Sequence, residues 1–373
     1  MLTNHFYKHT FNLIMLCKRG NYMNAANTSP LTYNNYTYSI LGENTSVQSF
    51  APRIKDYKIP SYKVREKRIG RFFSNKYIMS DYLKSTNSYF PIPVLSVTNI
   101  LGDICNTMVP QGICTFENYV LITAYDSQKI YNSVIYVLEN HKIITTLIYD
   151  KKVHMGGICY DGSQIWIAEG GGSAHGDEIS YITKDNLFST INTAVELKAK
   201  SITLQGINPL RAEKLTYTSF CSFYDNLLWI GSFNEKDTGQ IYGYAIINTN
   251  NTLSLKPVCY IEAPAKAQGI CFYEKEFTKY ICVSTSYGRR HNSVFKLYSL
   301  PDYYNPMGIY NNVKHIHKGL IYKTLTLPSM SEQINIYNNS IYCIFESGAS
   351  KYVKTSSRPI GSYCIFDANK IFQ

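Results

Sequence analysis

One short phrase occurs five times along this chain, altered each time. The copies occupy residues 111–114, 156–159, 218–221, 268–271 and, most altered, 332–335. Each is followed by a short turn and a run of strand-forming residues. Self-similarity at about 45–65 residues, in units made of short strands, is typical of a β-propeller, whose blades stack around an axis because no blade buries its own faces. The repeat predicts an all-β propeller of five blades, and a sixth would have to lie within the first 90 residues.

The repeat also predicts where each blade begins and ends. We expect the blades at residues 108–149, 155–209, 217–261, 268–326 and 331–366. The second and fourth are long, and their surplus, residues 194–215 and 301–318, should form loops on one propeller face, where binding elements usually lie. Residues 94–100 should supply a strand that pairs with the last blade and closes the ring. The sequence shows no sustained 3.6-residue apolar period, which favours strands over helices.

Charge divides the chain into two parts. Residues 1–90 hold 13 Lys and Arg against 4 Asp and Glu, whereas residues 91–373 hold 24 against 22. We therefore predict a basic, Tyr- and Asn-rich leader over residues 1–90, partly disordered, and the propeller over residues 91–373. Nine of the basic residues fall within residues 53–76. This segment could contact an anionic surface such as lipid, wall polymer or nucleic acid, or it could be a solvated charged stretch. No specific nucleic-acid-binding module accompanies it.

Neither the cysteines nor the N-terminal residues identify the cellular compartment of the protein. Cys114, Cys159, Cys221 and Cys271 occupy one equivalent position in four blades, which predicts packing in preference to a disulfide or a metal site. No apolar run approaches the length of a bilayer span, so we expect no transmembrane segment. A short apolar stretch at residues 11–17 is weak evidence for a signal peptide, and secretion stays open.

The position before each repeated glycine should lie at the mouth of the central channel. Glycine suits the innermost strands because backbones crowd together near the axis. The expected ring of mouth residues and their neighbours comprises Gln111, Gly156, Thr218, Gln268, Glu332, His154 and Ser331.

Glu332 is the only carboxylate in this ring. It could bind a cation, accept a proton or anchor a ligand amine, or it could pair with Lys351 or cap backbone donors. Glu169 and Glu346 end the second strands of blades two and five, so both should face the same mouth. Carboxylates gathered there could form a calcium site or an acid/base pair, although such residues more often stabilise turns. His154 precedes an inner strand and is either a structural histidine or a partner of Glu332.

These positions give two groups of candidate residues. The catalytic candidates are Glu332, His154 and Glu346, and the ligand-binding candidates are Gln111, Thr218, Gln268, Ser331, Glu169 and Lys351. No residues are assigned as metal ligands, and the sequence does not identify a cofactor. It contains no Gly-x-Ser-x-Gly nucleophile motif and no phosphate-binding loop.

Several separated phrases resemble a family of bacterial propeller proteins found mainly in clostridia and related Firmicutes. They lie at residues 154–158, 229–233, 268–271, 284–288, 327–332 and 345–352, in the same order as in that family. The likeness covers residues 105–366 and implies a propeller fold. It also implies an extracellular or cell-surface location, since many members look secreted. The family carries no established activity.

A weaker similarity is to the plant-type glutaminyl cyclases, which are five-bladed propellers. Residues 268–270 and 284–289 resemble the signature of that family. The catalytic Glu expected just before the Ser-Thr pair is Val283 here. The same chemistry would therefore need Glu346 or Glu332 to substitute from another blade.

The sequence supports two hypotheses about function. The first is a propeller that binds a small molecule, glycan or protein at its channel mouth and long loops, because no complete catalytic set is present and the fold often serves as a platform. The second is a hydrolase or glutaminyl-cyclase-like enzyme that uses Glu332 as acid/base. A perturbed carboxyl group in a pocket would favour the second, and a Glu332 neutralised by Lys351 would count against it.

Overall fold

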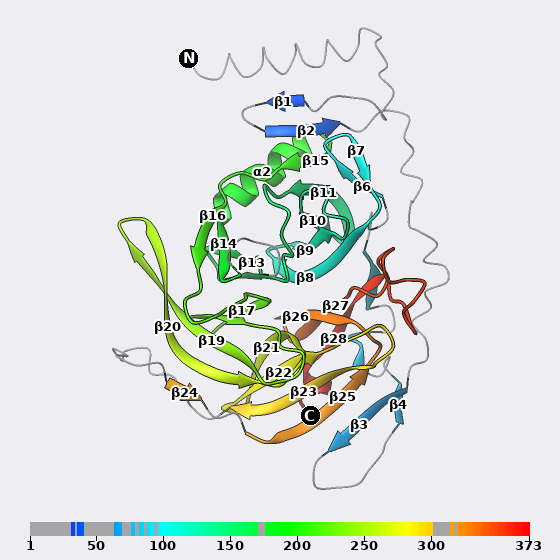
Figure 1. Ribbon diagram of the computed structural model, residues 1–373, viewed down its shortest axis with the longest axis vertical. Helices are drawn as coiled ribbons and strands as arrows, with labels where there is room; N and C mark the ends of the chain where they lie inside the picture. The colour runs from blue at the N-terminus through cyan, green and yellow to red at the C-terminus, as the bar shows by residue number, and fades with distance from the viewer. Residues whose placement is uncertain are drawn as a thin grey trace.

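The predicted five-bladed propeller is confirmed by a computed structural model of the protein (Figure 1). The structure describes residues 31–33, 36–40, 63–68, 76–78, 82–85, 88–92, 95, 97–170, 176–300, 314–316 and 319–373. Five of its sheets are the blades, and a small two-stranded sheet lies outside them.

Within each blade the first strand lies nearest the axis and the others follow outward, antiparallel to one another. Blade one contains β8 (Met108–Phe116), β9 (Tyr119–Asp126), β10 (Val134–Glu139) and β11 (Lys142–Ile148). Blade two contains β12 (Gly157–Tyr160), β13 (Gln164–Ala168), β14 (Glu178–Thr183) and β16 (Asn208–Arg211). Blade three contains β17 (Phe220–Tyr224), β18 (Leu227–Gly231), β19 (Gly239–Thr249) and β20 (Thr252–Ala263). Blade four contains β21 (Ala267–Lys275), β22 (Thr278–Thr285), β23 (Ser293–Leu300) and β25 (Ile321–Leu327). Blade five contains β26 (Ser331–Tyr337), β27 (Ser340–Phe345), β28 (Ser362–Asp367) and β5 (Tyr89–Pro91).

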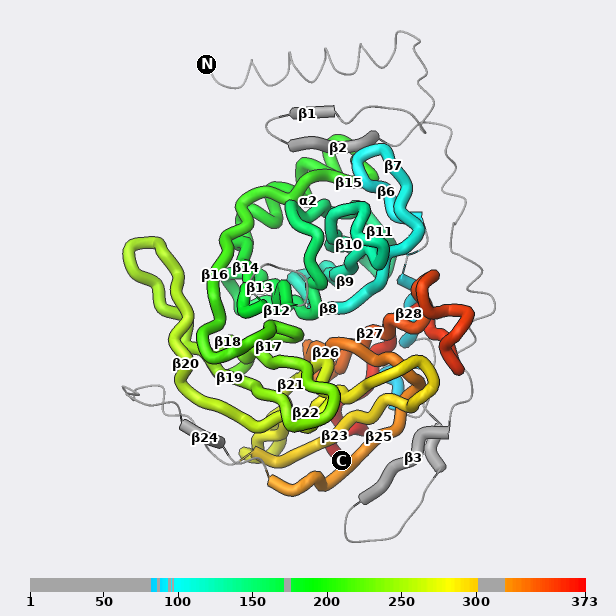
Figure 2. Tube along the Cα trace, in the orientation of Figure 1, coloured from blue at the N-terminus to red at the C-terminus, as the bar shows by residue number. Residues whose placement is uncertain are grey.

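The innermost strands pack against one another in a closed ring. The order of contact is β8, β12, β17, β21, β26 and back to β8, and these strands lie near the middle of the molecule in Figure 2. Several hairpins turn through two residues with positive φ, the geometry that matches the right-handed twist of strands and that Asn tolerates well. These turns are Asn140–His141, Asp225–Asn226, Asn250–Asn251, Glu276–Phe277 and Asn338–Asn339.

The ring closes a few residues earlier in the chain than predicted. β5 pairs with β28, with Pro91 opposite Ser362, and so supplies the outer strand of blade five. The prediction that residues 94–100 would do this was wrong. β6 (Thr98–Ile100) instead forms a local hairpin with β7 (Asp103–Cys105), turning through residues 101–102, which both have positive φ.

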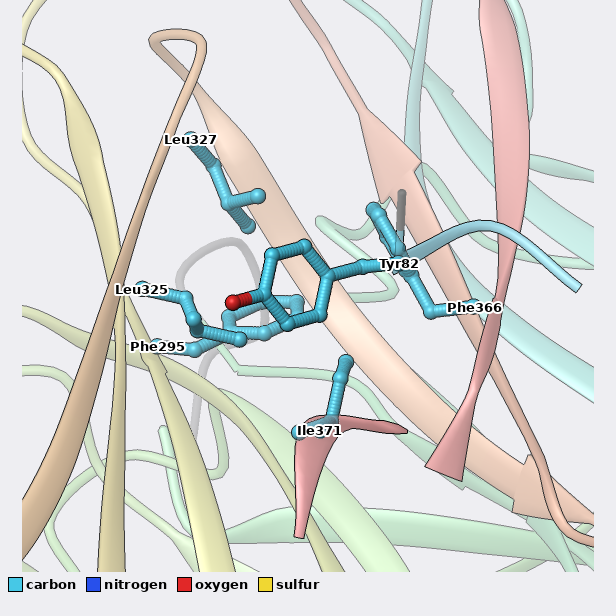
Figure 3. Close-up of a pocket in the computed structure, with 6 residues that line it drawn as sticks. All are labelled: Tyr82, Phe295, Leu325, Leu327, Phe366 and Ile371. Carbon is cyan, nitrogen blue, oxygen red and sulfur yellow. The ribbon is translucent and has the colours of Figure 1, made fainter. Parts of the chain in front are cut away.

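The segment before β5 is anchored between blades four and five. Figure 3 shows the Tyr82 ring in a cavity whose other lining residues are Phe295, Leu325, Leu327, Phe366 and Ile371. Lys323, only 2% exposed, places its Nζ 5.5 Å from the centre of the Tyr82 ring and donates a hydrogen bond to the carbonyl oxygen of Lys370. Leu83 bridges to Phe366 and the Lys84 N–H donates to the Ile365 carbonyl oxygen (2.9 Å), so Tyr82 and its two neighbours together anchor the segment before β5.

The surplus of blade two, residues 194–215, contains the end of a helix and two strands, so the prediction that it forms a loop on one face was wrong. Of the surplus of blade four, residues 301–318, the structure describes only residues 314–316. After β14 comes α2 (Lys184–Glu196), capped by Thr183, followed by β15 (Ala199–Thr203), which runs parallel to β11 of blade one. β24 (Lys314–Ile316) likewise runs parallel to β20 of blade three. Residues 301–313 and 317–318 lie outside the described part of the chain. Parallel pairing satisfies the outer edges of β11 and β20, which would otherwise be open.

Strands from the predicted leader also pair with the blades. β1 (Leu31–Tyr33) and β2 (Tyr36–Ile40) form a hairpin that extends blade one through β15, and β3 (Lys63–Arg68) and β4 (Lys76–Ile78) extend blade four through β25. Apart from β3 and the first residue of β4, the basic segment 53–76 lies outside the described residues. A short helix, α3 (Ala368–Ile371), follows β28. Among the described residues, no helix has the length and apolar character needed to cross a membrane.

Apolar clusters between neighbouring blades form the core. Cys114 packs with Leu121 and Ile158, and Cys159 and Cys221 lie together in the cluster around Trp166. All nine cysteines that the structure describes are buried and free. The predicted packing role of the repeated cysteines is confirmed.

Candidate functional site

The axis of the propeller is occupied by one side chain, that of Gln333. Its Oε1 accepts hydrogen bonds from the N–H groups of Ile113 (3.0 Å) and Ile158 (2.8 Å). Its Nε2 donates to the carbonyl oxygens of Ile158 and Cys221, both at 2.8 Å. Gly112 is required here, because a Cβ at that position would lie 2.8 Å from Gln333 Oε1. Gln333 therefore joins the inner strands of blades one, two and three to that of blade five.

The residue before Gln333 lies at the predicted mouth, where two carboxyl groups meet. Glu332, 4% exposed, comes from the start of β26, and Glu346 follows the end of β27. Their side chains are hydrogen-bonded to each other. Gln268 Nε2 donates to Glu332 Oε1 (3.3 Å), and Gln111 Nε2 donates to Glu346 Oε2 (3.1 Å). The structure thus brings four of the predicted site residues into one cluster.

The surroundings of this pair favour one shared proton. Burial, reinforced by the charge of Glu346, raises the pKa of Glu332 well above its ordinary value. Burial also raises the pKa of Glu346 to about 7, although hydrogen bonds from Gln111 and Glu332 and the charges of Lys351 and Arg289 oppose the rise. At neutral pH, Glu332 is therefore the protonated donor and Glu346 the acceptor, partly ionised.

His154 and Lys351 both contact Tyr125, the residue before the last of β9. The half-buried His154 ring stacks on Tyr125 with 4.7 Å between ring centres. Lys351 Nζ donates to the Tyr125 hydroxyl (3.3 Å). Burial, with a contribution from the charge of Lys351, lowers the pKa of His154 to about 4, so its ring is neutral at pH 7. Among the described residues, Lys351 forms no ion pair with Glu332.

Glu169 lies apart from this cluster, in a satisfied network between blades one and two. It is fully buried and accepts hydrogen bonds from Tyr149, Ser180 and Lys151, the last at 2.9 Å. The pKa of Lys151 is raised, because the hydrogen bond and charge of Glu169 outweigh the opposing effect of burial. Three hydrogen bonds and an ion pair thus compensate the burial of the Glu169 carboxylate.

Thr218 and Ser331 also lie in backbone and side-chain networks. The Thr218 hydroxyl donates to the carbonyl oxygen of Glu178 and accepts from the Gly170 N–H at 3.0 Å. The Ser331 hydroxyl shares a hydrogen bond with Ser284 at 2.9 Å. Neither hydroxyl is hydrogen-bonded to the carboxyl pair among the described residues, although Ser331 precedes Glu332 in the chain.

Three further residues contribute to the mouth that sequence reasoning did not select: Tyr125, Tyr352 and Arg289. Arg289 and Lys351 lie 5.1 and 4.9 Å from the centre of the Tyr352 ring. The alternation of side chains along a strand could have found Tyr125, which lies near the end of β9. Tyr352 and Arg289 lie in loops without a repeated counterpart, and although both fall within phrases that carry a family resemblance, nothing in those phrases assigns them a role.

A metal site is not built by these groups. Within the described residues, no cluster of three or more His, Cys, Asp or Glu side chains could hold a metal ion. The position of the glutaminyl cyclase carboxylate, Val283, is 1% exposed and packs in the apolar cluster between blades three and four.

Comparisons with known proteins give distant similarities of fold only. No protein-family model matches the chain, and no curated protein sequence matches it. An exo-β-1,3-galactanase of Phanerochaete chrysosporium aligns at 12% identity and a TM-score of 0.40, over 72% of this chain and 62% of the galactanase. An α-L-arabinofuranosidase of Clostridium thermocellum aligns at 9% identity and a TM-score of 0.37, over 69% of this chain and 88% of the enzyme. The chain thus spans less than two thirds of the galactanase. Likenesses this distant carry no argument about activity.

The carboxyl pair itself limits the chemistry of the mouth. Glycosidases keep their two carboxyl groups about 5–5.5 Å apart in retaining enzymes and about 6.5–9.5 Å apart in inverting ones. A pair in direct hydrogen-bond contact leaves no room for a sugar carbon or a water between its members. A contact pair can donate one hydrogen bond and accept several, and it can exchange a proton near neutral pH.

Proposed function

We propose that this propeller binds a polar, hydroxylated ligand at its channel mouth, with the Glu332–Glu346 pair as the central recognition group. The proton is shared within the pair, and the remaining lone pairs of its oxygens can accept hydrogen bonds, so the pair suits ligand donors such as sugar hydroxyls. Gln111 and Gln268 orient the pair. The aromatic rings of Tyr125 and Tyr352 supply the apolar surface that small-molecule sites usually combine with a few polar groups.

One observation carries this proposal: buried Glu332 and half-buried Glu346 lie against each other, and neither has an ion-paired cation among the described residues. Removing a carboxyl group from water costs stability unless it is well paired. Glu169 shows that the same scaffold can supply a lysine to a buried carboxylate. Groups with perturbed pKa values and a specific charged partner are candidates for a functional site.

The test is a thermal-shift panel on the full chain with neutral sugars, amines, sugar lactones, divalent cations and glutaminyl peptides. A ligand present at about a hundred times its Kd should add roughly 2.7 kcal/mol to the stability, a rise of several degrees in Tm. The rise should be lost in Glu332→Gln and in Glu346→Gln. The control is Glu276→Gln, the same substitution at an exposed hairpin turn. A ligand shift that survives in both mouth variants contradicts the proposal.

The proton-sharing pair also supports a second candidate, hydrolysis by general acid/base catalysis. A pKa of about 7 lets Glu346 take a proton from water at neutral pH, while protonated Glu332 donates one to the oxygen or nitrogen of the bond that is cleaved. The contact distance favours an acyl centre over a glycosidic bond. Chromogenic esters and peptide amides test this candidate. Turnover lost in both glutamine variants supports it, and turnover unchanged in them refutes it.

A further inference from the structure

Two loops beside the carboxyl pair form a continuous rim, which we define as residues 286–292 and 346–361. They join β22 to β23 and β27 to β28, and they run side by side in Figure 2. The Ser357 N–H donates to the Arg289 carbonyl oxygen (3.1 Å), and Arg289 Nη1 donates to Thr355 Oγ1 (3.1 Å). The rim therefore holds its side chains in a defined arrangement.

The rim is strongly basic. It contains five Lys and Arg residues and one acid, Glu346, which belongs to the pair itself. The basic residues are Arg289, Arg290, Lys351, Lys354 and Arg358. All five are exposed. Within the part of the chain that the structure describes, Arg289, Arg290, Lys351 and Lys354 form no ion pair. This gathering of like charge contrasts with residues 91–373 as a whole, whose 24 basic residues are nearly balanced by 22 acids.

Aromatic rings hold two of these cations in place. Arg289 and Lys351 both lie near the Tyr352 ring, and Lys351 Nζ also lies 5.6 Å from the centre of the Tyr125 ring. Cation–π contacts of this kind favour defined positions for the charged groups while leaving their hydrogen-bond donors free for an anion. The rim thus offers fixed positive charge and ring faces directly beside a group suited to hydroxyls.

We propose that the ligand of the mouth is an acidic oligosaccharide, whose carboxylate or sulfate groups bind the rim while its hydroxyl groups reach the Glu332–Glu346 pair. This inference rests on the proposed function and names its ligand class. A nucleic acid fits less well, because its phosphates would approach a partly ionised carboxyl pair. An oligosaccharide with acidic groups on some positions and hydroxyls on others matches both parts of the surface.

The test is calorimetric titration of the full chain at low salt with matched probes. Tetragalacturonate is compared with its methyl ester, which keeps the hydroxyls and loses the charges, and a heparin tetrasaccharide separates sulfate from carboxylate recognition. We expect the acidic probes to bind at least tenfold more tightly than the ester, and added salt to reduce the difference. Arg290→Gln/Lys354→Gln should weaken acidic probes by about fivefold to tenfold and leave the ester unchanged. The control Lys142→Gln/Lys256→Gln removes two exposed charges elsewhere and should change neither.

Failure of this inference can be told apart from failure of the proposed function. Equal binding of tetragalacturonate and its ester, lost in Glu332→Gln, overturns the acidic ligand and keeps the mouth site. Acidic binding that depends on the rim but not on Glu332 overturns the proposed function. Tighter binding of a single-stranded oligonucleotide than of any acidic tetrasaccharide overturns the ligand class.

Discussion

Two glutamates at matching positions of two blades have opposite surroundings. Glu169 follows the second strand of blade two and is met by three donors, one of them Lys151. Glu346 follows the second strand of blade five and meets a second acid, Glu332. The same backbone position therefore serves in one blade to join two sheets, and in the other to hold a proton where the blades converge. Repetition fixes where a side chain lies, and its neighbours decide what that side chain does.

The sharpest way to break this comparison is to remove the structural member. Glu169→Ala should destabilise the protein by about 3 kcal/mol, because it leaves Lys151 and the Tyr149 hydroxyl partly buried without their acceptor. Urea denaturation at pH 7 measures the change. Glu178→Ala is the matched control, since Glu178 lies 3.5 Å from the same lysine and is more exposed, so the loss should stay below about 1 kcal/mol. Equal losses in the two variants would show that Glu169 is not the structural carboxylate described here.

The carboxyl pair predicts that the free energy of unfolding falls as the pH rises. Both acids have folded pKa values above the ordinary value of 4.5, so their contribution is complete below pH 4.5 and is lost as the pH passes through about 7 and beyond. Between pH 5 and pH 8 the free energy of unfolding should fall by on the order of 2 kcal/mol, which lowers the Tm by several degrees. Glu332→Gln/Glu346→Gln should flatten this dependence. A double variant that keeps the wild-type slope would contradict the assignment.

A smaller effect is expected from a single donor to Glu169. Tyr149→Phe removes one of its three hydrogen bonds and leaves Lys151 and Ser180 in place, so the loss should be about 1 kcal/mol by thermal denaturation. Tyr125→Phe is the counterpart at the mouth. Its hydroxyl accepts from the exposed Lys351, and the change should stay below about 0.5 kcal/mol. The reverse order of the two losses would refute the distinction between the two networks.

The smallest expected effect is on proton affinity. Lys351 lowers the pKa of both Glu346 and His154, so Lys351→Met should raise both. NMR titration of the His154 ring and the Glu346 carboxyl carbon measures these values. Lys354→Met, on the same loop, should leave both nearly unchanged. A fall in either pKa after Lys351→Met would show that Lys351 is not the cation that acts on the mouth.

The sequence predicted most of the fold because the repeat marks every inner strand. The blade limits follow from that period, and the mouth positions of Gln111, Gln268 and Glu332 follow from their place before or within the repeated phrase. The helix α2 was missed because only three of its apolar residues, Leu187, Ile191 and Ala194, lie at helical spacing and are buried.

The rest of the site was beyond prediction for a physical reason. Lys351 was selected from the sequence, but Tyr352 and Arg289 were not, because they lie in loops whose conformation depends on contacts between two blades. The ion pair between Glu169 and Lys151 depends on the conformation of the segment between β11 and β12, which the sequence does not reveal. The role of Gln333 could have been predicted from the sequence. Alternate residues of a strand face opposite ways, and its neighbour Glu332 was assigned to the mouth.

The position of Gln333 in the chain has a consequence for the order in which the protein is made. Translation produces blades one, two and three before blade five, which carries this glutamine. Until residue 333 has left the ribosome, the backbone N–H groups of Ile113 and Ile158 and the carbonyl oxygen of Cys221 lack the partner that binds them in the finished structure. β5, among the first parts to be synthesised, waits equally for β28. The hydrogen bonds of Gln333 at the axis and the pairing of β5 with β28 are therefore both completed by residues that are synthesised last.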